Sequence, residues 1–337
     1  MTAPSILTVI LNYRTPAMTL RAAEAALSAQ DGLNAELLIV DNDSGDGSFE
    51  TLKEAVCARD WPVRVLQSGH NGGFGAGNNF GMRAGLSNGQ APDFYYILNS
   101  DAFPDPGGIR ALRDHLVAHP NVGFVGSYIK GEAGTAHQSA FRFPSALGEF
   151  EGAIRFGPVS RLLRASIVPL PVPEETVMVD WLAGASMMMR ARTLEEIGFF
   201  DETFFLYFEE TDLCRRAALA GWPTVFVRDS EVVHIGSVST GMKGWARVPQ
   251  YWFDSRWYYF TKNHGAAYAA YATCLHLTGG LLHRLRRLIE QKPQDTPDQF
   301  LRHLARHALG ALLSPRQPEP QPLPGLGTDP KREGDSL

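Results

Sequence analysis

Single carboxylates follow apolar, strand-like runs at two places in the N-terminal third of the chain. Asp41 comes directly after "ELLIV" and begins "DNDSGDGS", and Asp101 ends "YILNSD". A carboxylate at such a position can accept a hydrogen bond from a nucleobase imide or a sugar hydroxyl. It can also hold Mg²⁺ or Mn²⁺, which keep several non-protein ligands such as water and diphosphate oxygens. Each residue alone fits a polar turn or a helix cap equally well.

The segment "HNGGFGAGNN", residues 70–79, could bring backbone N–H groups close to a diphosphate. It is not a dinucleotide fingerprint, because Asn78 stands at the third glycine position, and no Gly-Lys-Ser/Thr follows as in a Walker loop. A flexible loop without a ligand explains the same residues.

Three acidic residues open a predicted helix in "YFEETDLCRR": Glu209, Glu210 and Asp212. The helix dipole favours acids there, and Asp212 can pair with Arg216 four residues on, so at least two of the three have a structural explanation. One of them could act as a general base. His234, after "EVV", is either a buried histidine or a neutral imidazole ligand.

Alternating elements must position these residues. Apolar runs at residues 7–11, 36–40, 63–66, 94–98 and 122–126 are separated by segments compatible with helices, including one from Thr15-Pro16 to Gln30 and one from Ser48 to Ala58. This is typical of an α/β protein with a mainly parallel sheet. Ligands bind beyond the carboxyl ends of such strands, so four consecutive polar or glycine-rich strand ends should line one rim.

Composition restricts the class of protein. The 337 residues are 44% hydrophobic, and 31 Lys plus Arg against 36 Asp plus Glu give a net charge of −5, with no global reason to expect a nucleic-acid partner. Three scattered cysteines and the missing secretory signal predict a cytoplasmic protein. The most apolar window, residues 266–282, contains His276 and Thr278, which argues against a membrane span.

The second half of the chain is less regular. Residues 127–180 contain "VPLPVPEE" and predict loops and short strands, and the next segment, to about residue 228, predicts strand, helix, loop, helix and strand. Residues 246–313 predict a helical extension whose "LLHRLRRLIE" and "FLRHLARHALGALL" fit either packing on the preceding domain or peripheral contact with an anionic membrane. Residues 314–337 are rich in proline and charge, which predicts a disordered tail.

Together, these segments resemble family 2 glycosyltransferases, which are inverting enzymes with a GT-A fold, and in particular their rhamnosyltransferase-like bacterial branch. The matching segments span about residues 6–262: "VILNYR", "LLIVDNDSGDGS", "NGGFGAGNN", "YILNSDAFPDP", "DWLAGASMMMRA", "GFFDETFFLYFEETDLCRRAALAGW" and "VVHIGSVST". The resemblance implies a Rossmann-like catalytic domain over residues 1–245, with a nucleotide-sugar half over 1–126 and an acceptor half over 127–245.

The resemblance also implies roles for individual residues. The nucleotide would contact Asn12, Tyr13, Asp41, Asn71, Gly73, Asn78 and Asn99, with Asn12 and Asp41 at the base. Asp101 fills the last position of the family's metal-binding triplet, whose first position is here Asn99, and His234 would complete a site for Mg²⁺ or Mn²⁺.

On the acceptor side, the resemblance puts Glu210 in the place of the family's aspartate base, with Glu209 as the alternative. Trp181 to Gly184, together with Asp212, would face the acceptor sugar. Arg256 would offset charge on the leaving diphosphate, although a solvated helix charge explains it as well.

The implied activity is transfer of a sugar, with L-rhamnose from dTDP-rhamnose preferred, to a glycan or polyprenyl-linked glycan in cell-surface polysaccharide synthesis. Hexosyl or galactofuranosyl transfer from a UDP- or GDP-sugar is the alternative, and a non-catalytic binder of nucleotide sugars or glycans is another. A sugar-1-phosphate nucleotidyltransferase fits less well, because "LNYRTPAMT" lacks the glycines of that class's first loop.

Overall fold

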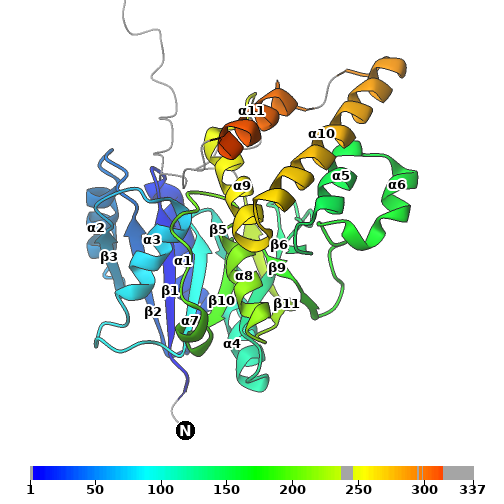
Figure 1. Cartoon of the computed structure of the whole chain (residues 1–337). Helices are drawn as coiled ribbons and strands as arrows, with labels where there is room; N and C mark the ends of the chain where they lie inside the picture. Colours follow the sequence, from blue (N-terminus) through cyan, green and yellow to red (C-terminus); the bar gives the residue numbers. More distant parts are fainter. Residues whose placement is uncertain (1–2, 237–245, 294–295, 298, 314–337) are drawn as a thin grey trace, which may run out of the picture.

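The protein is built around one large twisted sheet (Figure 1), seen in a computed structural model that describes residues 3–236, 246–293, 296–297 and 299–313. The strand order is β3-β2-β1-β4-β10-β6-β11-β5. The first four strands are parallel, as the apolar runs predicted: β1 (Ile6–Asn12), β2 (Ala35–Asp41), β3 (Val63–Gln67) and β4 (Phe94–Asn99).

The remaining strands make the sheet mixed. β10 (Ser186–Arg190) is antiparallel to both β4 and β6 (Phe124–Lys130), and β6 is parallel to β11 (Thr224–His234). The far edge of β11 is shared by two short antiparallel strands, β8 (Val177–Val179) and β5 (Ala102–Pro104). A separate ribbon joins β7 (Ala140–Phe141) to β9 (Trp181–Leu182).

Alternation along the strands produces a core on each side of the sheet, because successive side chains point to opposite faces. Ile6 and Ile10 face the layer of α1 (Pro16–Ala29), α2 (Ser48–Ala58) and α4 (Gly108–Ala118). Leu7 and Val9 face α3 (Gly73–Arg83), α7 (Ala191–Ile197) and α8 (Glu209–Leu219).

The carboxyl ends of the parallel strands form the predicted rim. The register pairs Asn12 with Asp41 and Leu11 with Asn99, so these strand ends lie side by side. β10 begins at the same rim, because the backbone N–H of Asn99 donates a 3.0 Å hydrogen bond to the carbonyl of Ala185, the residue before β10. The sequence pattern therefore predicted which residues meet at this edge.

The glycine-rich segment forms a helix and not the loop considered from its sequence. Its glycines allow α3 to lie unusually close to the sheet: a Cβ on Gly77 would lie 2.5 Å from Leu11, and one on Gly81 would lie 2.6 Å from Val9. Burial against the sheet thus outweighs the cost of glycine within a helix, about 1 kcal/mol per residue.

Residues 127–180 include two helices, α5 (Ala146–Ile154) and α6 (Gly157–Leu162), and a short 3₁₀ turn (Arg164–Ser166) where only loops and strands were predicted. The predicted C-terminal helices are present as α9 (Gln250–His264), α10 (Ala266–Ile289) and α11 (Phe300–Leu313). A third core joins α5, α9 and α10 to Phe204.

Among the described helices, none has the length and hydrophobicity needed to cross a bilayer. The proposed boundary between catalytic domain and extension falls in residues 237–245, and the proposed tail covers 314–337. Both lie outside the described residues, as does the end of "VVHIGSVST".

Candidate active site

Asn12 and Asp41 form a buried polar pair at the ends of β1 and β2. The Asn12 amide donates a 2.7 Å hydrogen bond to Asp41 Oδ1, and Thr19 Oγ1 donates a 2.7 Å bond to Asn12 Oδ1. The Ser44 amide and hydroxyl both donate to the Asp41 carboxylate. These contacts fix the loop after β2, and Tyr13 stands beside the pair, half-buried under the Arg14 guanidinium.

The start of α3 is held by an asparagine pair. Asn42 Nδ2 donates to Asn71 Oδ1 at 2.9 Å, and the Gly73 amide donates to the same oxygen at 3.0 Å. The other end of the Asn71 side chain, Nδ2, is buried without a hydrogen-bond partner. A buried donor without a partner is costly, so this amide is a candidate for contact with a ligand.

Gly73 and Asn78 have structural explanations of their own. Gly73 has a φ of 91°, and a side chain there would collide with the Phe205 carbonyl, which accepts a 3.0 Å hydrogen bond from the Phe74 amide. Asn78 Nδ2 donates to the Phe74 carbonyl at 3.0 Å, one helical turn back. Both residues therefore shape the start of α3.

Asp101 and His234 meet across β5 and β11. His234 Nε2 lies 3.1 Å from Asp101 Oδ1 and 3.5 Å from Asn99 Nδ2, while the Ile235 amide donates to the Asp101 carbonyl oxygen at 3.1 Å. In the described part of the chain no third His, Cys, Asp or Glu joins them to make a larger ligand group. Two protein ligands with converging donor atoms fit Mg²⁺ or Mn²⁺ when a diphosphate and water supply the others.

Glu209 and Glu210, the first residues of α8, point to different neighbours. Glu210 Oε1 accepts a 3.2 Å hydrogen bond from the Gly184 amide, beside the "WLAG" segment. Glu209 is buried, its Cβ lies 3.8 Å from the position of a Cβ on Gly75 of α3, and its Oε2 has no hydrogen-bond partner.

The pKa of both carboxyl groups is raised. Burial is the main cause for each, and the charge of Glu210 adds to the rise in the pKa of Glu209. A carboxylate with a raised pKa is a better proton acceptor near neutral pH. Glu210 combines this property with partial exposure and a position beside the segment expected to face the acceptor.

Trp181 borders the same region. Its ring stacks on Phe141 with centroids 4.1 Å apart, and its Nε1–H donates to the Arg142 carbonyl at 2.8 Å. The indole is half-buried and held in one orientation by these contacts. A fixed aromatic face of this kind suits stacking against a sugar ring.

A contact of Asp212 with the acceptor is not supported. Its carboxylate is fully buried and accepts hydrogen bonds from Arg216 at 2.9 Å and Lys262 at 2.8 Å. Lys262 also pairs with Asp201 at 2.7 Å. Asp212 therefore joins α8 to α9.

The predicted role of Arg256 at the leaving group is not supported either. Its side chain is buried, its Nη2 donates to Glu149 of α5 at 2.8 Å, and its Nη1 donates to Thr273 of α10 at 3.0 Å. His276 Nδ1 lies 2.6 Å from the same Glu149 oxygen. The guanidinium thus belongs to the core of the C-terminal extension.

The loop before α8 has an unusual backbone that the sequence did not predict. Tyr207 and Phe208 have φ values of 71° and 69°, a left-handed conformation that non-glycine residues rarely adopt. Ser255 of α9 donates to the Leu206 carbonyl at 2.9 Å, and Tyr251 packs on Phe205 at 5.5 Å. The aromatic density of "FFLYF" and "YWF" was its only signal in the sequence.

The fold and these residues define a glycosyltransferase of the GT-A class. Residues 3–259 match the family described as "Glycosyltransferase like family 2", and the chain belongs to this family.

The chain is also similar to two proteins that are named as sugar transferases. The chain is 31% identical over 244 residues to the N-acetylglucosaminyl-diphospho-decaprenol L-rhamnosyltransferase of Mycobacterium tuberculosis, covering 70% of this chain and 78% of the relative. It is 28% identical over 184 residues to the low-salt glycan biosynthesis hexosyltransferase Agl10 of Haloferax volcanii, covering 54% and 53% of the two chains.

Solved structures share the fold. GalNAc-T7, crystallised with UDP, GalNAc and Mn²⁺, superposes with a TM-score of 0.57 at 14% identity, over 91% of this chain and 55% of that one. This chain thus spans about half of that structure. The mannosyltransferase PcManGT of Pyrobaculum calidifontis, with GDP-Man and Mn²⁺, gives 0.54 at 15% identity, over 94% and 82%.

Proposed function

We propose that this glycosyltransferase moves L-rhamnose from dTDP-rhamnose, with inversion, to a glycan or polyprenyl-linked glycan. The rhamnosyl relative in M. tuberculosis supports the donor sugar and the lipid-linked acceptor. The observation that carries the transfer reaction is that the two halves of the site meet at one hydrogen bond, from the backbone N–H of Asn99 to the Ala185 carbonyl. It joins the strand end that leads to Asp101 to the segment whose Gly184 binds Glu210.

In this mechanism Glu210 accepts the proton of the attacking acceptor hydroxyl. The hydroxyl oxygen forms a bond to the anomeric carbon while the bond from that carbon to the diphosphate oxygen breaks, so configuration inverts in one displacement. The amide of Gly184 holds the carboxylate in place. General-base assistance of this kind contributes about 10²–10⁴-fold to rate.

Asp101 and His234 would hold Mg²⁺ or Mn²⁺. The metal, when bound, neutralises negative charge on the departing diphosphate. The converging donor atoms of this pair support the assignment, and the Mn²⁺ in two structures of the same fold agrees with it. The unpartnered amide of Asn71 would contact the nucleotide from the α3 side, with Asn12, Tyr13 and Asp41 supporting the base.

The test is a thermal-shift panel of dTDP, UDP, GDP and CDP, each with Mn²⁺ or with EDTA. We expect dTDP with Mn²⁺ to raise the Tm of the wild type and not of Asp101→Ala, because binding stabilises the folded state. Asp229→Ala, which removes an exposed carboxylate of β11, is the matched control and should respond as the wild type. If only UDP or GDP raised the Tm, the donor would be a UDP- or GDP-sugar instead. If no nucleotide raised the Tm in a metal-dependent way, the proposal would be refuted.

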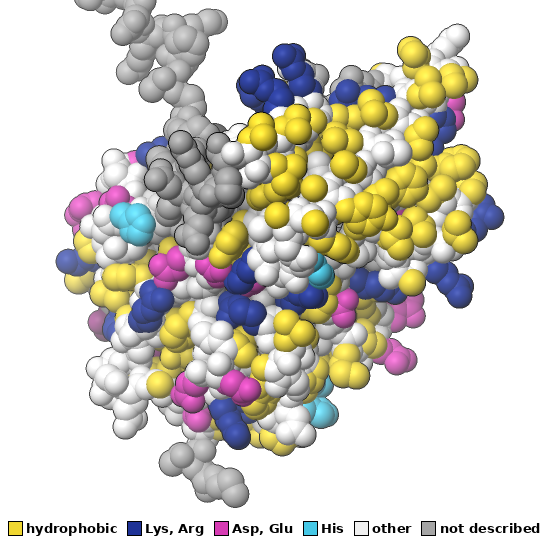
Figure 2. Space-filling view, viewed as in Figure 1, with side chains coloured by type: hydrophobic (Ala, Val, Ile, Leu, Met, Phe, Trp, Pro, Cys, Tyr) yellow, Lys and Arg dark blue, Asp and Glu magenta, His cyan; other side chains and the backbone are white. Residues whose placement is uncertain are grey.

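We also propose that the C-terminal helices rest on an anionic membrane surface. Figure 2 shows a broad hydrophobic surface over α10 and α11 with basic side chains at its margin. Its exposed apolar residues are Leu281, Leu282, Leu285, Leu288 and Ile289 of α10 and Leu309, Leu312 and Leu313 of α11. An apolar face bordered by arginines fits the boundary between acyl chains and anionic headgroups.

A further inference from the structure

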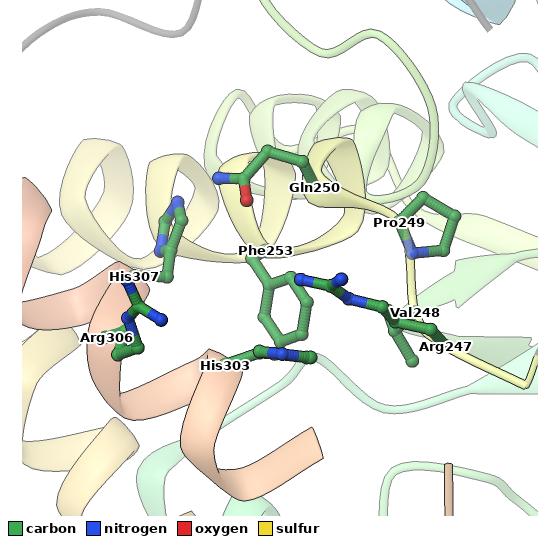
Figure 3. A pocket seen from close by; sticks show the side chains of 8 residues that line it. All are labelled: Arg247, Val248, Pro249, Gln250, Phe253, His303, Arg306 and His307. Carbon is green, nitrogen blue, oxygen red and sulfur yellow. The ribbon is translucent and has the colours of Figure 1, made fainter. Parts of the chain in front are cut away.

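A pocket lies between the start of α9 and the α11 helix. It has a volume of about 580 Å³, within the usual range for small-molecule sites. Its lining residues are Arg247, Val248, Pro249, Gln250, Phe253, His303, Arg306 and His307. Figure 3 shows the Arg247 side chain extending over the pocket from the segment before α9, while His303, Arg306 and His307 come from α11.

The pocket is positively charged. Neither Arg247 nor Arg306 has a carboxylate partner among the residues that the structure describes. Asp254 is the acidic residue in contact with the lining, and its Oδ1 is bonded to His307 Nε2 at 2.7 Å and Gln250 Nε2 at 3.1 Å. Burial, together with the charges of Arg247, Arg302 and Arg306, lowers the pKa of His303. An anion would relieve this repulsion between like charges.

Apolar space adjoins the basic pocket. A smaller cavity of about 180 Å³ between α5, α10 and α11 shares Val248 with it. Its lining combines apolar residues, among them Trp252, Phe300 and Leu301, with the basic residues Arg155, His276, His283 and Arg284. Phe253 of the basic pocket packs on Phe300 with centroids 5.6 Å apart. Outside the cavity, α10 and α11 also carry exposed leucines.

Helix α9 connects the pocket to the loop that precedes the proposed base. Gln250 and Phe253 line the pocket, while Tyr251 and Ser255 contact Phe205 and Leu206 of the loop that leads into Glu209 and Glu210. A group bound in the pocket would therefore lie across α9 from the loop that precedes the proposed base.

We propose that this pocket binds the diphosphate of a prenyl-diphosphate-linked acceptor, with the start of the prenyl chain against the adjoining apolar residues. The proposal rests on the proposed transferase function and specifies its acceptor. Arg247 and Arg306 would donate charge-assisted hydrogen bonds to the phosphate oxygens, which arginine recognises in a planar, bidentate way.

The test measures binding of farnesyl diphosphate to the full chain by calorimetry in EDTA, which removes the divalent cations through which a diphosphate would bind near Asp101. Farnesol, inorganic pyrophosphate and vesicles containing phosphatidylglycerol are the comparison probes. The variant is Arg247→Gln/Arg306→Gln. Its matched control is Arg161→Gln/Arg164→Gln, which removes two charges from exposed positions of α6 and the following 3₁₀ turn, outside the pocket.

We expect farnesyl diphosphate to bind the wild type and Arg161→Gln/Arg164→Gln alike, with Kd at least about tenfold higher for Arg247→Gln/Arg306→Gln. Farnesol should bind weakly, because it lacks the charge. In the transfer assay, Arg247→Gln/Arg306→Gln should raise KM for a lipid-diphosphate acceptor and leave KM for the donor unchanged.

Equal binding of farnesyl diphosphate by Arg247→Gln/Arg306→Gln and the wild type would overturn the proposal. So would pyrophosphate or vesicle binding that depends on the two arginines without any contribution from the prenyl diphosphate. The nucleotide panel separates failure of this proposal from failure of the proposed function. If farnesyl diphosphate bound through the two arginines but no nucleotide bound, the pocket would stand as a prenyl-diphosphate site, and its ligand would no longer be identified as the acceptor of a transferase.

Discussion

Glu210 Oε1 lies 3.2 Å from the amide nitrogen of Gly184, in space that any larger residue at position 184 would occupy. A Cβ built on Gly184 would be 2.5 Å from that oxygen and 3.0 Å from the Glu210 Cγ. The glycine therefore gives the carboxylate both a hydrogen-bond donor and room. This contact separates the two neighbouring glutamates, since Glu209 turns toward α3.

Gly184→Ala should displace the Glu210 carboxylate from its position. We expect kcat to fall by about 10²-fold, at the lower end of the effect of losing a general base. Glu210→Gln should lower kcat by about 10²–10⁴-fold. Steady-state transfer kinetics with nucleotide binding measured alongside would check both, and nucleotide binding should persist. Gly310→Ala, at a helical glycine with open space around it, is the control. Full activity of Glu210→Gln together with inactive Glu209→Gln would reverse the assignment of the base.

Glu209 makes the stability of the protein depend on pH. Burial and the charge of Glu210 raise its folded pKa above the ordinary 4.5. The folded state is therefore favoured below pH 4.5, and this contribution is lost as pH rises through the raised pKa. Glu209→Gln stays neutral, so its free energy of unfolding relative to wild type should increase from pH 5 to pH 8. Urea unfolding at both pH values would measure this.

The exposed Glu24 of α1 provides the control for that experiment. Glu24→Gln should leave the difference between the two pH values as in the wild type. A pH-independent difference for Glu209→Gln would show that the Glu209 carboxyl does not titrate with a raised pKa.

The pair formed by Arg256 and Glu149 predicts a stability effect without a binding effect. Burial opposes ionisation of Glu149, but Arg256 and His276 lower its pKa to about 2. Because the folded pKa is depressed, this contribution is present above pH 4.5 and lost as pH falls toward 2. Arg256→Gln leaves a buried carboxylate without its main partner and should cost about 3–5 kcal/mol of unfolding free energy.

Nucleotide binding should be unchanged in Arg256→Gln at a temperature where the variant is folded. Thermal-shift titration with dTDP and Mn²⁺ would measure it. Specific loss of nucleotide binding, with the unfolding free energy of wild type, would restore the leaving-group role that the sequence suggested for this arginine.

Local patterns predicted the sheet and its rim because apolar runs and strand-end polar residues are properties of neighbouring positions. Asn12, Asp41 and Asn99 are each found where a strand ends, and the parallel register then brings them together. The glycines of α3 led to the prediction of a loop, because helix propensity considers a residue without its tertiary contacts. In the fold, Gly77 and Gly81 lie so close to Leu11 and Val9 of β1 that a side chain would not fit. Such packing overrides propensity.

The roles of Asp212 and Arg256 could not be predicted from local sequence for a different reason. The Arg256 partner Glu149 is 107 residues away, in a helix that the weak periodicity of residues 127–180 did not indicate. The Asp212 partner Lys262 is 50 residues away. Only the packing of the C-terminal helices on the catalytic domain determines which charges are already paired.

The proposed membrane contact predicts that the exposed apolar residues of α10 contribute to vesicle binding. Leu288 and Ile289 lie at its exposed C-terminal end, with Leu288 76% accessible. Leu288→Gln/Ile289→Gln should lower partitioning into phosphatidylglycerol vesicles by about tenfold or more, because each side chain loses roughly 1.5–3 kcal/mol of burial on transfer. Vesicle co-sedimentation would measure this. Leu219→Gln is the control, since Leu219 is 75% accessible but belongs to α8. An equal loss of vesicle binding in both variants would indicate nonspecific adsorption. Vesicle binding that is unchanged by the α10 substitutions would refute membrane contact through the C-terminal end of α10.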